Sequence, residues 1–245
     1  MGRDEQARLR PMRRTVLIGL GASAFGLLPA RPHAAGAATP DDSARIAPPD
    51  TKAAADTARA VLYEEDPGDR NGKRFAGTVR WRIDMQSTGS NATPDTMVRA
   101  GVTIPERQMT LNWTLRRNQD RSLPATHTVD LKFAVAEEFS HGGIQNVPGL
   151  LMKQGEQTRG TPLRGLAVKV TEEYFLIGLS SAEGDRGINI QLLREREWID
   201  MPIVYQDGRR AILAIEKGPA GARAFRQAFA AWDGAGPSPL STDTK

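Results

Sequence analysis

The chain has 245 residues, of which 39% are hydrophobic and 25% charged, and no cysteine, which excludes disulfides, thiol nucleophiles, thiolate zinc sites and iron–sulfur clusters. Its formal net charge of +4 lies at the start: residues 1–37 hold six of the 33 basic and two of the 29 acidic residues, which leaves 27 of each elsewhere. A formally neutral body lacks the counterion-release drive for binding phosphate backbones, so we expect no nucleic-acid partner.

Residues 1–37 have the three parts of a bacterial export signal. A basic region ends at Arg13-Arg14, an apolar stretch follows over residues 15–28, and a small-residue region contains Ala35-Gly36-Ala37. The apolar stretch is shorter than the roughly 18 residues of a membrane-spanning helix. The pattern therefore predicts a periplasmic or secreted protein that meets the membrane only transiently, through its signal peptide.

The export route and the fate of the leader stay open. The run from Arg13 to Leu17 resembles a twin-arginine signal, but Val16 stands where that pattern favours Phe, so the general secretory (Sec) route also fits. Cleavage is expected after Ala37, and the alternative is a leader retained as a packed helix or an anchor.

Residues 38–57 predict a flexible linker. They are rich in Ala, Pro, Asp and Thr, contain Pro48-Pro49 and show no apolar period. The folded domain is then expected over residues 58–234, and the polar residues 235–245 are expected to form a disordered tail.

Apolar and polar residues alternate with a period of two through the first half of the domain. One apolar and one polar face is typical of strands in an antiparallel sheet. The alternating segments are residues 75–85, 97–104, 107–117 and 126–135, and their inward set includes Phe75, Gly77, Val79, Trp81, Ile83, Met85, Val98, Val102, Leu111, Trp113, Val129, Leu131 and Phe133.

The second half is also interpreted as strands. Residues 165–170 and 174–179 are short apolar runs, and residues 187–195 alternate at first through Ile188 and Ile190. In residues 201–216 the pair Asp207-Gly208 separates two apolar runs, which predicts a β-hairpin because this pair suits the positive backbone angles of a tight turn.

A helix is predicted at the C-terminal end of the folded domain. Gly218-Pro219 suits a helix start, and Phe225, Ala228, Phe229 and Trp232 share one helical face. About ten strands in series followed by one C-terminal amphipathic helix predict a mainly β fold: a single antiparallel β-sandwich or a half-open, jelly-roll-like barrel.

The segment from Glu137 to Leu163, "EEFSHGGIQNVPGLLMKQGEQTRGTPL", has neither helical nor strand periodicity, and compact domains rarely carry so long a loop without a role. Its apolar residues indicate that it folds back over a sheet, with Lys153, Gln154, Gln157 and Arg159 exposed. Two interpretations stay open: a structural lid, or a recognition edge for a partner or ligand.

Candidate ligand-binding residues can be named, but catalytic residues cannot. Glu137, Glu138 and His141 could together face a divalent ion, yet their spacing matches no zinc signature, so we predict no metal. His127 is either a hydrogen-bonded rim residue or a ligand or base at the mouth of the fold, and Tyr205 could line a ligand face. The candidates are Glu137, Glu138, His141, Lys153, Gln157, Arg159, His127 and Tyr205.

Motifs for phosphate loops, dinucleotide binding, H-E-x-x-H metal sites and complete nucleophile elbows are missing from the sequence, so no cofactor is predicted. Acidic residues are numerous, but no pair stands out as the facing carboxylates that a glycosidase needs.

The stretches "VLYEEDPGDRNGKRFAGTVRWR", "HGGIQNVPGLLMKQGEQTRGTPL" and "DMPIVYQDGRRAILAIEKG" resemble a group of exported, β-rich proteins of proteobacteria. The resemblance implies no activity, because none is established for that group. The sequence therefore favours a non-catalytic envelope domain that binds a protein, a glycan or a small ligand. The alternative is an envelope hydrolase that acts on carbohydrate or peptide through a carboxylate pair.

Overall fold

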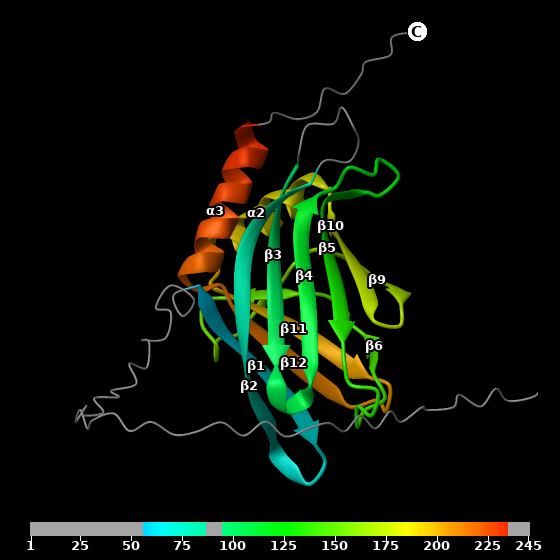
Figure 1. Ribbon diagram of the computed structural model, residues 1–245. Coiled ribbons are helices and arrows are strands. Elements are labelled where there is room, and N and C mark those ends of the chain that lie inside the picture. Colours follow the sequence, from blue (N-terminus) through cyan, green and yellow to red (C-terminus); the bar gives the residue numbers. More distant parts are fainter. Residues whose placement is uncertain (1–55, 87–94, 235–245) are drawn as a thin grey trace, which may run out of the picture. The chain divides into compact units, whose positions relative to one another are not determined.

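The computed structural model describes residues 56–86 and 95–234 (Figure 1). The expected signal peptide at 1–37, the linker up to residue 55 and the tail at 235–245 lie outside the described residues. The last two positions of the expected linker are described, and Thr57 already begins a strand. None of the described helices combines the length and apolar character needed to cross a membrane.

A single antiparallel sheet curls into a half-barrel, which confirms the predicted mainly β fold (Figure 1). Its strand order is β8-β7-β11-β12-β1-β2-β3-β4-β5-β10-β9, and β6 pairs with β11 off this path. The strands are β1 (Thr57–Asp66), β2 (Asp69–Gln86), β3 (Asp95–Ile104), β4 (Met109–Arg117), β5 (Ala125–Ala134), β6 (Ile144–Asn146), β7 (Leu151–Lys153), β8 (Thr161–Pro162), β9 (Gly165–Thr171), β10 (Tyr174–Ser180), β11 (Trp198–Tyr205) and β12 (Arg210–Glu216).

The predicted alternation in β2 to β5 is confirmed by burial. Val79, Val98, Trp113 and Leu131 are fully buried, and the polar residues that alternate with them in β2 and β4 are exposed or half-buried, whereas Thr128 and Asp130 of β5 are buried as well. The prediction was wrong for Met85, which is 64% exposed near the end of β2, where the strand extends beyond the core.

The predicted hairpin at Asp207-Gly208 is confirmed between β11 and β12. The amide of Tyr205 donates to the carbonyl of Arg209 at 2.9 Å, and the amide of Gly208 donates back to Tyr205 at 3.0 Å. Only the glycine has a positive φ in this turn, 84°, a conformation that a residue without a Cβ adopts at little cost.

The C-terminal helix is also confirmed, as α3 (Gly218–Gly234), which packs against β1, β2 and β3. Phe225 lies with its ring centroid 5.5 Å from Trp81 and 5.9 Å from Trp113, and Phe229 and Trp232 continue the buried face. This stripe of aromatic rings attaches the helix to the sheet.

The strand expected over residues 187–195 is wrong, because the chain there forms a second helix, α2 (Glu183–Glu195). Asn189, Leu192 and Leu193 are buried at helical spacing, whereas Ile188 is 42% exposed. Two long-range contacts hold the helix: the Asn189 side chain exchanges hydrogen bonds with the backbone of Arg164, and the Lys217 ammonium donates to the carbonyl of Leu193 at 2.6 Å. Alternation over a few residues did not distinguish a strand from a helix in this segment, and the tertiary contacts determine that it is helical.

The segment from Glu137 to Leu163 folds onto the sheet as expected, and parts of it join that sheet. β6 and β7 both pair with β11, and β8 pairs with β7. Its buried apolar residues are Phe139, Ile144, Val147, Leu150, Met152 and Leu163. The segment therefore extends the half-barrel by short strands and contributes to its core.

Candidate functional site

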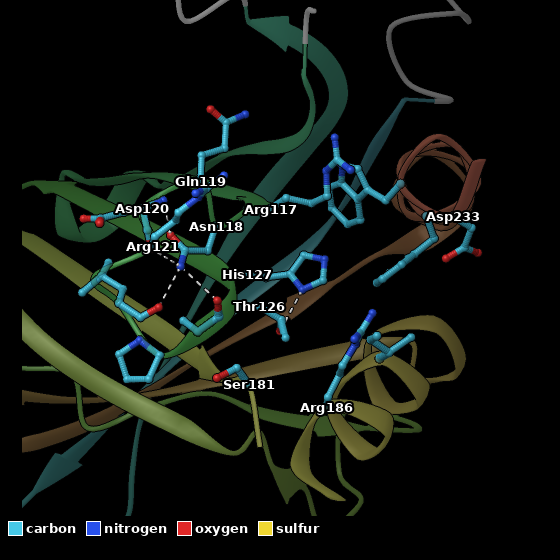
Figure 2. A pocket seen from close by; sticks show the side chains of 16 residues that line it. Arg117, Asn118, Gln119, Asp120, Arg121, Thr126, His127, Ser181, Arg186 and Asp233 are labelled. Carbon is cyan, nitrogen blue, oxygen red and sulfur yellow. Dashed lines mark hydrogen bonds between the residues drawn. The ribbon is translucent and has the colours of Figure 1, made fainter. Parts of the chain in front are cut away.

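A cavity of about 860 Å³ lies where one end of the sheet meets the two helices (Figure 2). The β4–β5 hairpin supplies one wall through residues 117–127. α2 supplies Arg186 and Ile190, and the last turns of α3 supply Phe229, Trp232 and Asp233. Three segments that are far apart in the sequence thus form one site.

The hairpin wall is fixed by its own hydrogen bonds. The side-chain amide of Asn118 donates to the carbonyls of Asp120, Leu123 and Ala125 at 2.8, 3.1 and 2.9 Å (Figure 2). The carboxylate of Asp120 accepts from both the backbone and the hydroxyl of Ser122. Because side chains occupy the backbone groups of the loop, this wall is formed before any ligand arrives.

His127 lies in the cavity wall with one ring nitrogen unused. It is 7% exposed, and its Nδ1 lies 3.1 Å from the hydroxyl of Thr126, whereas Nε2 is buried without a hydrogen-bond partner in the described part of the chain. Burial, with smaller contributions from Arg186 and Arg117, lowers the pKa of His127 to about 4, against the opposing effect of Asp95. The ring is therefore neutral near pH 7, and Nε2 is a buried polar atom that lacks a partner.

The charges around His127 are mostly guanidinium groups. Figure 2 shows the imidazole between Arg117 and Arg186. Arg117 is held by Asp95, with Nη2 and Oδ1 2.8 Å apart, but neither Arg121 nor Arg186 forms an ion pair with any described acid. Of the two acids that line the cavity, Asp233 pairs with Arg194 and Asp120 has no ion pair in the described chain, so two unpaired guanidiniums face one unpaired carboxylate, which favours a negatively charged occupant.

The opposite wall is apolar and rigid. Trp232 donates its indole N–H to the carbonyl of Thr96 at 2.9 Å, and its ring lies 5.0 Å from Phe229 and 4.9 Å from His127. Ile190 of α2 adds to this surface, and Leu123 supplies an apolar side chain from the hairpin. A ligand in this cavity would thus meet both guanidinium groups and aromatic or aliphatic surface.

Of the residues suggested by the sequence, His127 alone lies in this cavity. His141 and Tyr205 form a separate buried cluster, in which their rings stack 4.7 Å apart and the hydroxyl of Tyr205 donates to Glu64 at 2.7 Å. Tyr205, which we expected to be able to line a ligand face, is fully buried. Its pKa is raised by burial and by the hydrogen bond to Glu64, so it is a neutral donor.

His141 connects two acids within that cluster. Its Nδ1 lies 2.8 Å from Asp207, and its Nε2 lies 3.5 Å from Glu64. Arg107 donates to the same Glu64 at 3.0 Å and to Ser140 at 3.0 Å. These contacts anchor the start of the long segment to β1 and to the β11–β12 turn, which is a structural task.

Lys153 is also not where we expected it. It is buried rather than exposed, pairs with Asp200 at 2.7 Å, and donates to the carbonyl of Glu156. Burial raises the pKa of Asp200 while Lys153 opposes the rise. The pair of Lys153 and Asp200 joins β7 to β11. Lys153 is therefore a buried, paired ammonium group and not the exposed free cation that we expected.

The remaining candidates are exposed. Glu137 and Glu138 lie at the surface before Phe139, and Gln157 and Arg159 lie at the surface after β7, where Gln157 donates to the hydroxyl of Tyr63 at 3.0 Å. Nowhere in residues 56–86 and 95–234 do three or more His, Asp or Glu side chains gather in a way that could hold a metal ion.

Sequence reasoning missed Arg117, Arg186 and the α3 aromatics as site residues. Arg117 stood at the end of a predicted strand before a polar loop, which was a usable signal. Arg186 lay beside the segment interpreted as a strand, and Phe229 and Trp232 were interpreted as the shared apolar face of the C-terminal helix. Their convergence depends on the packing of α2 against β10 and α3.

Comparisons with models of protein families, with curated proteins and with solved structures each gave no match to this chain.

Proposed function

We propose that this chain is an exported, non-catalytic binding domain that holds a small organic anion in the cavity between the β4–β5 hairpin, α2 and α3. The observation that carries the proposal is Nε2 of His127, a buried ring nitrogen without a protein partner, placed between Arg117 and Arg186. A polar atom buried in this way is stabilised by a hydrogen bond from or to a ligand. Export rests on the sequence pattern of residues 1–37.

The walls define the ligand's chemistry. An anionic group such as a carboxylate fits the guanidiniums of Arg186 and Arg121, which hold no other acid in the described chain. A flat or aliphatic body fits the surface of Phe229, Trp232 and Ile190. His127, whose charge is suppressed, supplies one directional hydrogen bond between these two parts.

The acids at the cavity support binding over hydrolysis. Asp120 accepts two hydrogen bonds from Ser122, and Asp233 pairs with Arg194 at 2.6 Å. A carboxylate pair acting on a glycosidic bond needs one acid free to donate a proton and another free to attack or to activate water. Both acids of this cavity are already engaged, so the hydrolase alternative has less support.

The test is titration calorimetry of the whole chain with a panel of aromatic and aliphatic carboxylates, each matched with its neutral amide. We expect carboxylates to bind and their amides to bind at least about tenfold more weakly, since a charge-assisted hydrogen bond contributes about 1.5–3 kcal/mol. Arg186→Gln should weaken carboxylate binding by a similar factor.

The matched control is Arg226→Gln, which removes an exposed arginine of α3 that does not line the cavity. Its affinity should equal that of the unaltered chain. Equal binding of acids and amides, or equal loss in both variants, would contradict the proposal. Analysis of the recovered ligand separates the alternatives further, because a binding domain returns it unchanged and a hydrolase does not.

A further inference from the structure

The face of the sheet turned away from α3 carries a polar groove. α3 packs on the side of Trp81 and Trp113, so the residues that alternate with them point to the opposite face. There a groove of about 580 Å³ crosses β2, β3, β4, β5 and β10, which lie side by side in this order (Figure 1). It shares no lining residue with the cavity at α2 and α3. Its volume lies within the range of about 300–1,000 Å³ that is usual for small-ligand sites.

Basic side chains outnumber acids along this groove. The basic residues that line it are Arg82, Arg99, Arg116 and Lys132, and the acid is Asp130. Arg116 pairs with Asp130 at 3.2 Å, and Arg99 pairs with Asp84, beside the groove, at 3.1 Å. In the described chain Arg82 and Lys132 form no ion pair, and both are exposed. Because residues 38–245 are formally neutral, this excess of positive charge is local to the groove.

Two features of β3 weaken the sheet at this place. Arg82 of β2 faces Arg99 across the strand pair, and like charges at facing positions are destabilising. Further along β3, Gly101 faces Arg80 on one side and Asn112 on the other, and a Cβ built there would meet no nearby atom. The pairing is regular here, so Gly101 marks no bulge, and a glycine inside such a strand suits the close approach of a ligand. Departures of this kind from a stabilising sequence are typical of functional sites.

Asp130 is a buried acceptor in the groove with a fixed orientation. It is 8% exposed, and its two carboxylate oxygens accept from the hydroxyl of Tyr174 and from Nε of Arg116. An ionised carboxylate has about four lone-pair sites, so two of them are left for a ligand. A carboxylate repels a bare anion but accepts a hydrogen bond from a hydroxyl group. The groove therefore suits a ligand that carries hydroxyl groups as well as negative charge.

We propose that this groove binds an acidic saccharide, a short chain of sugar units that carry carboxylates as well as hydroxyls. Arg82 and Lys132 hold the carboxylates through charge-assisted hydrogen bonds. Asp130 accepts hydrogen bonds from sugar hydroxyls, and Asn112 and Thr114, which also line the groove, add an amide and a hydroxyl for the same purpose. This inference does not depend on the cavity at the helices or on its ligand.

Other anionic ligands fit the groove less well. The apolar residues that line it, Met97 and Ala100, are 3% and 2% exposed, so the acyl chains of a phospholipid would find no surface there. A chain of phosphates without hydroxyl groups would meet Asp130 with no hydrogen bond to offer it. Anionic phospholipid vesicles and tripolyphosphate therefore belong in the test as competing ligands.

Titration calorimetry of the whole chain with uronate tetramers (galacturonate, mannuronate and glucuronate) tests the ligand class. Each tetramer is matched with its methyl ester, which keeps the hydroxyls of the tetramer and loses the charge, and with a short polyacrylate, which has carboxylates without hydroxyls. We expect at least one tetramer to bind, and its ester and the polyacrylate to bind at least about tenfold more weakly. Arg186→Gln, in the other cavity, should leave this binding unchanged.

A double variant tests the place of binding. Arg82→Gln combined with Lys132→Gln should weaken the binding of the tetramer at least about tenfold, because both unpaired cations are lost. Both side chains are exposed, so the fold should survive the change. The matched control is Arg159→Gln combined with Arg226→Gln, which removes two exposed cations outside the groove and should bind like the unaltered chain.

Asp130→Asn separates recognition from general attraction. The change removes a negative charge from the groove, so attraction alone predicts tighter binding of the tetramer and of polyacrylate. Recognition of hydroxyls predicts weaker binding of the tetramer, because a neutral amide oxygen is a poorer acceptor than a carboxylate. Circular dichroism and thermal melting show whether the sheet is intact in this variant, and the exposed double variant decides the question if it is not.

Several outcomes would overturn the proposal. Equal losses in the two double variants would mean that net charge, and not the groove, attracts the saccharide. Tighter binding of phospholipid vesicles or tripolyphosphate than of every tetramer would assign the groove to another class of anion. Loss of tetramer binding in Arg186→Gln would place the saccharide in the cavity at the helices, and no binding of any tetramer would leave the groove without this role.

Discussion

His127 combines a titratable ring with an apolar setting. The ring lies 4.9 Å from Trp232 and 6.2 Å from Phe229, and burial, Arg186 and Arg117 lower its pKa to about 4. In the unfolded chain an imidazole takes up its proton near pH 6.5. Between these two pKa values the unfolded state binds more protons than the folded state, so the free energy of unfolding falls as the pH falls.

We therefore predict that His127 contributes an acid-side loss of stability of at most about 3–4 kcal/mol, since one pKa unit corresponds to about 1.4 kcal/mol. His127→Phe should flatten this part of the pH dependence between about pH 6.5 and about pH 4. Urea unfolding at both ends of that range measures the difference. Thr126→Val is the control: it removes the partner of Nδ1 but keeps the titrating ring, so the slope should persist.

At the scale of the element, strands β2 and β3 approach each other closely at Gly77. A Cβ built there would collide with the carbonyl oxygen of Thr103 and with Cδ1 of Ile104. A Cβ built at Gly101, on the neighbouring strand, would meet no nearby atom. We predict that Gly77→Ala lowers the free energy of unfolding by about 1–3 kcal/mol through this overpacking.

The control for Gly77→Ala is Gly101→Ala, which should leave stability nearly unchanged. Chemical denaturation of both variants, compared at equal slope, gives the two values. Equal losses of unfolding free energy at the two positions would show that the effect comes from the lost backbone freedom of glycine and not from the contact with Thr103.

The elements that the sequence predicted well are those whose signal is local. The alternation of β2 to β5, the Asp207-Gly208 turn and the aromatic face of α3 can each be found within about a dozen residues. α2 failed because its burial depends on Arg164 and Lys217, which lie outside it in the chain. β1 was missed because Ala60, Val61 and Leu62 are buried in succession, a pattern of a strand covered on both faces that does not alternate.

The candidate site was predicted only in part, for the same reason. His127 could be placed by its parity with Val129, because the strand fixes which side its ring faces. Arg186 and Trp232 join it only through the packing of two helices. His141 and Lys153 show the opposite error: each is polar in a loop-like stretch, yet the buried Glu64 and the half-buried Asp200 hold them inside.

At the scale of the whole domain, α3 packs against the curled sheet and also forms part of the cavity wall. Phe225 is 2% exposed between Trp81 and Trp113, and the ammonium of Lys217 lies 4.2 Å from its ring centroid. We predict that Phe225→Ala costs about 3–5 kcal/mol, because the helix loses its central contact. Thermal unfolding followed by tryptophan fluorescence measures this loss.

Gln227→Ala, on the exposed face of the same helix, is the control and should melt like the unaltered chain. At temperatures where Phe225→Ala is still folded, it should also bind carboxylates less well, since Phe229 and Trp232 depend on the position of α3. Unchanged melting in Phe225→Ala would show that the helix is fixed by other contacts.

β1 lies between β2 and β12, with Ala60 opposite both Gly77 and Ile215. The domain's earliest strand thus receives its second neighbour only after nearly the entire chain has been synthesised. Contacts between such distant residues make folding slow, and until they form β1 offers an open flank to other nascent chains. A message truncated before Ile215 would yield a product with that flank permanently unpaired, and such a product should aggregate rather than accumulate as a smaller soluble domain.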